Sequence, residues 1–138
     1  MRDERDEVVR ELVAEWMRRA RSDLAVASLT EDERIAPEIL AFHAQQAAEK
    51  ALKGMLVRRQ VDFPHTHDIR LLLDLCLTAG FEGIDTLAAA VGLTRYAVAT
   101  RYPSGDEPVT RQEAREAAEL ATRVLGWAEM HLAQELGC

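Results

Sequence analysis

Apolar residues recur every three or four positions along most of the chain, the spacing that is typical of amphipathic helices. No stretch shows the regular alternation of apolar and polar residues that indicates a half-buried strand. The pattern therefore predicts five helices. We expect them at about residues 4–29, 37–59, 66–80, 86–101 and 110–135.

Turn and capping residues divide the predicted helices. Pro37 suits the first turn of the second helix, and Gly80 is expected to end the third. The segment "YPSGDEP" is the clearest turn, and Thr110 with Glu113 forms a capping box for the last helix. Short connections favour antiparallel neighbours. We predict an all-α protein, a single domain over 1–138, folded as an up-and-down four-helix bundle with one shorter extra helix.

The second predicted helix carries a row of polar residues beside its apolar stripe. In "AFHAQQAAEKALKGML", turning about 100° per residue brings His43, Gln46, Lys50 and Lys53 to one edge of the face formed by alanines and Met55. Donors at the border of a core face, rather than opposite it, require an explanation.

Two more charged residues lie on predicted apolar faces. Asp23 falls inside the apolar stripe of the first helix. Arg101 ends a stripe in the fourth helix, at a C-terminus where a cation is favoured. That stripe consists of Leu87, Val91, Thr94 and Val98. A buried charge needs a partner, so Asp23 could pair with Lys50 or with Arg101. Two interpretations follow: a salt-bridge network that fixes bundle register, or a site for a phosphate or base at the bundle edge.

Composition limits the function classes. The chain of 138 residues has a net charge of −7, which argues against strong non-specific binding to a nucleic-acid backbone but leaves a local basic site possible. No run of apolar residues is long enough to span a membrane, and the first residues are too charged for a signal peptide. These features predict a cytoplasmic protein with no membrane partner.

Metal and cysteine chemistry is not expected. In "PHTHD", His65, His67 and Asp68 supply at most three ligands, and His67 or Asp68 more simply helps to begin the third helix. Cys76 lies in an apolar run, and Cys138 is the last residue. We predict no disulfide, no metal and no cofactor.

Four segments, in order and with their spacing, carry a resemblance to a known family. They are "ARSDLAVASL", "FHAQQAAEKALKGMLV", "PHTHDIRLLL" and "TRYPSGDEPVTRQEA". Together they resemble the HEPN domain, a small helical domain of higher eukaryotes and prokaryotes named for nucleotide binding. The resemblance covers about residues 16–133, and the second-helix segment with "PHTHD" is its most specific part.

The resemblance implies a helical bundle that commonly forms homodimers. Prokaryotic members are often encoded beside a minimal nucleotidyltransferase, and several such pairs are toxin–antitoxin modules. In these pairs the HEPN protein is the toxin, a metal-independent ribonuclease, and the nucleotidyltransferase silences it by attaching AMP to a tyrosine. A homodimer also fits the residues themselves, because Trp16 and Trp127 lie near helix edges and the second and fifth helices have alanine-rich faces.

The sequence departs from the ribonuclease branches of the family. Those members carry an arginine followed four to six residues later by a histidine, which places a cation for the phosphate near an imidazole for proton transfer. Here "YPSGDEPVT" follows Arg101, and His131 is the only later histidine. The chain instead resembles members whose fourth helix ends in "RYP". His43 could in principle replace the missing imidazole from another helix, but we do not expect it to do so.

In the family the second-helix polar row faces a groove near the fourth helix. The resemblance therefore implies that His43, Gln46, Lys50 and Arg101, with Lys53, converge on a nucleotide phosphate or RNA backbone, and that Tyr102 stacks on a base. The leading hypothesis is a nucleotide- or RNA-interacting protein that works with a nucleotidyltransferase. The alternatives are a metal-independent ribonuclease with a non-standard site and a non-catalytic helical dimerisation module.

Overall fold

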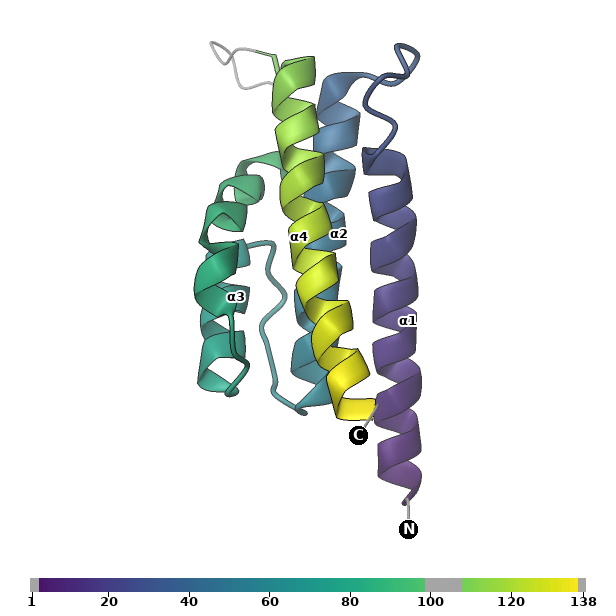
Figure 1. Ribbon diagram of the computed structural model, residues 1–138, viewed down its shortest axis with the longest axis vertical. Coiled ribbons are helices and arrows are strands. Elements are labelled where there is room, and N and C mark those ends of the chain that lie inside the picture. The colour runs from purple at the N-terminus through teal and green to yellow at the C-terminus, as the bar shows by residue number, and fades with distance from the viewer. Residues whose placement is uncertain (1–2, 99–107, 137–138) are drawn as a thin grey trace.

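The computed structural model describes residues 3–98 and 108–136 and contains five helices (Figure 1). They are α1 (Glu4–Ala27), α2 (Pro37–Arg58), α3 (Ile69–Thr78), the 3₁₀ helix η1 (Ile84–Tyr96) and α4 (Arg111–Leu136). No strand occurs among the described residues. The prediction of an all-α helical bundle is confirmed.

The central element of the bundle is α2, which contacts all four other helices. Figure 1 shows α1, α2 and α4 as three long, roughly parallel rods, with α3 and η1 on the far side of α4 and α2 from α1. The chain rises in α1, descends in α2 and descends again in α4, so that both ends of the described chain lie at the same end of the bundle.

Alanines make the central position of α2 possible. Ala41, Ala44, Ala47, Ala48 and Ala51 are fully buried. Their small side chains let neighbouring backbones approach closely. Burial of apolar surface at these contacts stabilises the fold by about 25 cal/mol for each Å² removed from water. The first helix comes so close at Gly54 that an added Cβ atom would lie 3.1 Å from the Cβ of Trp16. A helix buried on most of its sides leaves only a narrow edge for polar groups.

Several predicted helix boundaries are confirmed. Pro37 is the first residue of α2. At the start of α4, Glu113 N–H donates to Thr110 Oγ1 at 3.0 Å, and Thr110 N–H donates to Glu113 Oε1 at 2.9 Å, which is the expected capping box. Gly80 follows the end of α3 with a φ of 95°, a conformation that glycine adopts without strain. The start of α3 was predicted slightly early, because Asp68 is its N-cap and accepts from Leu71 N–H.

The fourth helix differs from its prediction in type, length and buried face. Its buried side chains are spaced three residues apart, as the three residues per turn of a 3₁₀ helix require. They are Ile84, Leu87, Ala90, Leu93 and Tyr96. The predicted stripe is therefore wrong after Leu87: Val91 is only partly buried and Val98 is 52% exposed. Arg101, which ends the predicted stripe, lies outside the described residues.

The composition of η1 explains why this spacing is tolerated. Side chains at positions i and i+3 eclipse one another in a 3₁₀ helix. The exposed rows of η1 contain Ala88, Ala89 and Gly92, whose small size avoids crowding. In addition, the Thr94 hydroxyl oxygen accepts a hydrogen bond from the backbone N–H of Ile69 at 3.1 Å, which ties η1 to the start of α3.

One arginine at the start of α4 fixes the connection between α1 and α2. The guanidinium of Arg111 donates to the backbone carbonyl of Thr30 at 2.8 Å and to that of Ile35 at 3.0 Å. The relative position of α1 and α2 is thus set at one end by this connection.

Among residues 3–98 and 108–136, no helix is both long and apolar enough to cross a membrane.

Candidate functional site: two carboxylate-centred clusters on α2

The first cluster joins α1 to α2 and consists of Asp23, His43 and Lys50; we call it the Asp23 cluster. His43 Nδ1 lies 2.8 Å from Asp23 Oδ1, and Lys50 Nζ donates to Asp23 Oδ2 at 2.6 Å. Asp23 is 9% exposed, in agreement with its predicted place on a core face. Of the two partners considered for it from the sequence, Lys50 is in contact, whereas Arg101 lies outside the described residues.

Both partners of Asp23 reach the protein surface. The His43 side chain is 29% exposed and the Lys50 side chain 23% exposed. In the part of the chain that the structure describes, His43 Nε2 makes no hydrogen bond. The buried carboxylate thus holds the imidazole through Nδ1 and leaves Nε2 for an external group, an arrangement that suits proton transfer. Lys50 has three ammonium protons and can still donate to a phosphate.

Gln46 connects this edge of α2 with a second group of polar side chains. Its Nε2 donates to Gln45 Oε1 at 2.7 Å, and Gln45 Nε2 donates to Glu49 Oε1 at 3.0 Å. Gln46 is half-buried, whereas Gln45 is fully buried. The predicted polar row is therefore continuous with a deeper hydrogen-bonded network.

The second cluster consists of Gln45, Glu49, Lys53 and His67; we call it the Glu49 cluster. Lys53 Nζ donates to Glu49 Oε2 at 3.0 Å, and His67 Nδ1 lies 2.8 Å from Glu49 Oε1. The side chains of Glu49 and Lys53 are only 5% and 7% exposed, respectively, whereas that of His67 is 54% exposed. The cluster binds the connection after α2 to the helix itself.

The predicted position of Lys53 at the border of the core is wrong, because this lysine lies inside it. Its ammonium group is 6.0 Å from the centroid of the Trp16 ring and 5.7 Å from that of Phe63. The connection at residues 59–68 runs back along the bundle (Figure 1), and Phe63, which belongs to it, packs by its edge against Trp16. The connection therefore covers the side of α2 that carries Lys53, which helical periodicity alone would leave exposed to solvent.

Glu49 is ionised in spite of its burial. Burial would raise the pKa of its carboxyl, but hydrogen bonds from Gln45, His67 and Lys53 outweigh this effect and hold the pKa below its usual range. A buried carboxylate that accepts three hydrogen bonds and faces an ammonium group satisfies the general requirement for buried charges. We assign the Glu49 cluster a structural role.

Sequence reasoning did not identify the Glu49 cluster. One signal was present, since Glu49 and Lys53 are four residues apart, the spacing of a helical ion pair. The contribution of His67 depends on the path of the connection and could not be read from local spacing. Within the described residues, no three His, Cys, Asp or Glu side chains gather as they would around a metal ion.

Other predicted residues lie elsewhere. Arg101 and Tyr102 fall outside the described residues. Trp127 packs on a neighbouring segment: its Nε1–H donates to the Glu82 carbonyl at 2.8 Å, and its ring centroid lies 4.7 Å from that of His131. Cys76 is buried, and burial raises the pKa of its thiol to about 12, so this cysteine is an inert core residue.

Comparison with known proteins adds to this geometry. The sequence model of the HEPN domain family matches residues 13–131 of the chain. The crystal structure of TT1696 from Thermus thermophilus is similar, with 34% sequence identity and a TM-score of 0.68 over 86% of this chain and 96% of that one. The crystal structure of ST0689, an archaeal HEPN homologue, is similar with 26% identity, the same TM-score and the same coverage. No curated protein matches the chain significantly.

Proposed function

Because the chain belongs to the HEPN domain family, we propose that it binds the phosphate of a nucleotide or of RNA and works with a minimal nucleotidyltransferase in a toxin–antitoxin module. The observation that carries this proposal is the Asp23 cluster. One buried carboxylate holds an imidazole and an ammonium group side by side at the protein surface.

The chemistry of the cluster suits a phosphate better than a neutral ligand. Lys50 supplies a cation with free donor capacity, His43 Nε2 supplies a second polar contact, and the half-buried Gln46 extends the row. Lys53 takes no part, because its ammonium group is buried against Glu49. Arg101 and Tyr102 remain contributors predicted from the sequence, one to the phosphate and one to a base.

A competition assay tests the binding site. Fluorescence anisotropy with a labelled single-stranded RNA, and with ATP or AMP as competitor, should give a dissociation constant that rises about tenfold in Lys50→Gln, the scale of one lost charge-assisted hydrogen bond. Arg70→Gln is the matched control, because Arg70 is exposed and makes no ion pair among the described residues. An equal loss of RNA affinity in both variants would indicate only general electrostatic attraction and would contradict the proposed site.

The second candidate function is a metal-independent ribonuclease with a non-standard site. The hydrogen bond between Asp23 and His43 Nδ1 favours it, because a carboxylate that orients an imidazole is a common feature of acid–base catalysis. The histidine spacing of the ribonuclease branches is nevertheless missing after Arg101. We therefore expect weak or no cleavage of RNA by the purified protein. Efficient cleavage in the presence of a chelator that disappears in His43→Ala would establish this second function instead.

The proposed partners are a second copy of the chain and the nucleotidyltransferase. Exposed apolar side chains on α1, Val8 at 53% and Leu12 at 49%, offer surface for association. Sedimentation at micromolar concentration should show a homodimer, and a single species of 15.4 kDa would contradict it.

Incubation with ATP and a nucleotidyltransferase encoded beside this chain should add AMP to a tyrosine, as seen by mass spectrometry; an unmodified protein would contradict the partnership.

A further inference from the structure

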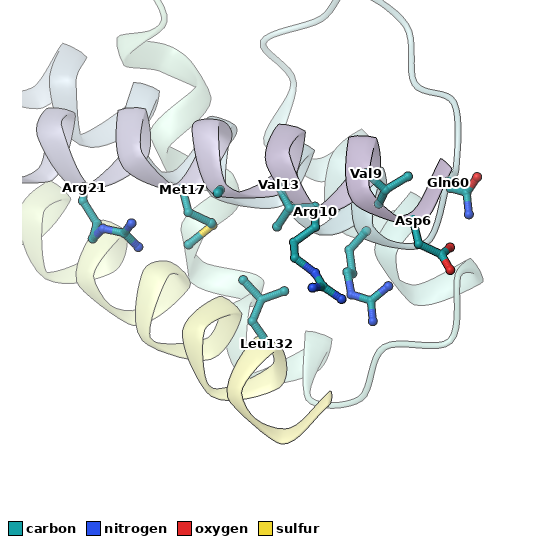
Figure 2. A pocket seen from close by; sticks show the side chains of 10 residues that line it. Asp6, Val9, Arg10, Val13, Met17, Arg21, Gln60 and Leu132 are labelled. Carbon is teal, nitrogen blue, oxygen red and sulfur yellow. The ribbon is translucent and has the colours of Figure 1, made fainter. Parts of the chain in front are cut away.

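A cavity of about 390 Å³ lies between the N-terminal half of α1 and the C-terminal end of α4, and residues at the end of α2 close one side (Figure 2). Its volume is within the range of small-molecule sites. The cavity is separate from the Asp23 cluster, which lies between α1 and α2. Nothing in the proposed phosphate site uses it.

The wall of the cavity is aliphatic on one side. Figure 2 shows Val13 and Met17 of α1 pointing toward Leu132 of α4 across the space between the two helices. Val9 continues this wall toward the open end. Among the described residues no aromatic ring lines the cavity, so they offer no stacking partner for a nucleobase. The wall fits a hydrocarbon body instead.

Guanidinium groups surround the aliphatic wall. Arg10, Arg21 and Arg58 all line the cavity. Two of these arginines already have acidic partners. Arg58 Nε forms an ion pair with Glu135 Oε2 at 2.9 Å, without the geometry of a hydrogen bond, and Arg21 forms one with Glu129 at 3.5 Å. Arg10 is exposed and has no ion pair or hydrogen bond within residues 3–98 and 108–136.

The end of α2 supplies a further polar group. Gln60 has a φ of 55°, a left-handed conformation that few residues other than glycine adopt. A hydrogen bond from its N–H to the Val57 carbonyl at 3.0 Å holds this turn. Figure 2 shows the Gln60 side chain at the outer end of the cavity, near Asp6. The amide can donate to an anionic head group, whereas Asp6 favours a singly charged carboxylate over a phosphate monoester, which carries a higher charge at neutral pH.

We propose that this cavity binds a small amphiphilic anion, a molecule with an aliphatic body and one carboxylate or phosphate head. The body would lie on Val9, Val13, Met17 and Leu132. Arg10 would bind the head group, because a guanidinium pairs with both carboxylate and phosphate oxygens and Arg10 has no competing acidic partner among the described residues.

Isothermal titration of the full chain with octanoate and with octyl phosphate tests the proposal and separates the two head groups. At least one of them should bind saturably, whereas acetate, inorganic phosphate and 1-octanol, which lack either the body or the charge, should bind at least about tenfold more weakly. Saturable binding of 1-octanol at equal strength would overturn the role of charge. No saturable binding of either amphiphile would overturn the site.

Two variants locate the binding. Ala14 lines the cavity but is exposed, so Ala14→Phe should fill the cavity without disturbing the core and should abolish binding. Arg10→Gln should weaken binding about tenfold, and Arg5→Gln, an exposed arginine of the same helix outside the cavity, should leave it unchanged. Thermal unfolding confirms that the variants fold. Binding that survives both Ala14→Phe and Arg10→Gln would contradict the proposal.

Discussion

The Asp23 cluster and the Glu49 cluster are built from the same parts but differ in burial. In each, one carboxylate contacts a histidine Nδ1 and a lysine Nζ at distances between 2.6 and 3.0 Å. In the Asp23 cluster the side chains of His43 and Lys50 are both about one quarter exposed. In the Glu49 cluster the lysine is buried and only the histidine is exposed.

This difference separates a candidate site from a structural device. Lys53 and Glu49 neutralise each other away from water, and removal of either would leave a buried charge without a partner. Lys50 and His43 can exchange contacts with water or with a ligand while Asp23 holds them in place. Chemical composition alone would assign both clusters the same role, whereas burial distinguishes them.

The largest effect is expected for Glu49→Ala. It leaves the buried Lys53 ammonium group without its partner and should lower the free energy of unfolding by about 3–5 kcal/mol, the usual cost of breaking a buried pair. Denaturant unfolding measures this loss. The double variant Glu49→Leu/Lys53→Met should recover most of it, and a double variant as unstable as Glu49→Ala would show that packing rather than charge is responsible.

A smaller loss is expected for Asp23→Asn. Lys50 and His43 are partly exposed, so water can replace the lost carboxylate, and the free energy of unfolding should fall by only about 1–2 kcal/mol. The same denaturant experiment applies. A loss as large as that in Glu49→Ala would place the two clusters in the same structural class.

The pH dependence of stability provides a third comparison. The pKa of Glu49 is lower in the folded protein than in the unfolded chain, so its stabilisation is complete above the unfolded pKa of about 4.3 and is lost as the pH falls through the folded pKa. The gap in free energy of unfolding between the wild type and Glu49→Gln should therefore narrow as the pH falls below about 4. A gap that stays constant across this range would contradict the assignment.

The smallest effect is expected for His67→Ala. The His67 side chain is 54% exposed, and Lys53 and Gln45 remain to satisfy Glu49. Its removal should lower the free energy of unfolding by at most about 1 kcal/mol. A thermal melt suffices to measure this change. A loss comparable to that in Glu49→Ala would mean that the histidine, not the lysine, is the essential partner of the carboxylate.

Local sequence rules predicted those parts of the molecule that local geometry determines. Pro37, Gly80 and the Thr110–Glu113 capping box mark helix ends through interactions within a few residues, and all three lie where expected. The internal position of Asp23 followed from helical periodicity in the same way.

Features that depend on the path of the whole chain escaped prediction. The periodicity rule assumes an α-helix, so it misplaced the buried face of η1, whose period is three. The same rule placed Lys53 at an edge, because nothing in its own helix reports that Phe63 covers it. His67 joins Glu49 for the same reason, across 18 residues of sequence.

The central claim is that the Asp23 cluster is a binding site and the Glu49 cluster is not. Its most direct test is the affinity of the labelled RNA for Lys50→Gln, measured at low salt beside the free energy of unfolding of the same variant. We predict an affinity about tenfold lower and a stability loss of no more than about 1 kcal/mol, because Lys50 is partly exposed. Unchanged affinity together with a clear loss of stability would contradict the claim and make both clusters structural.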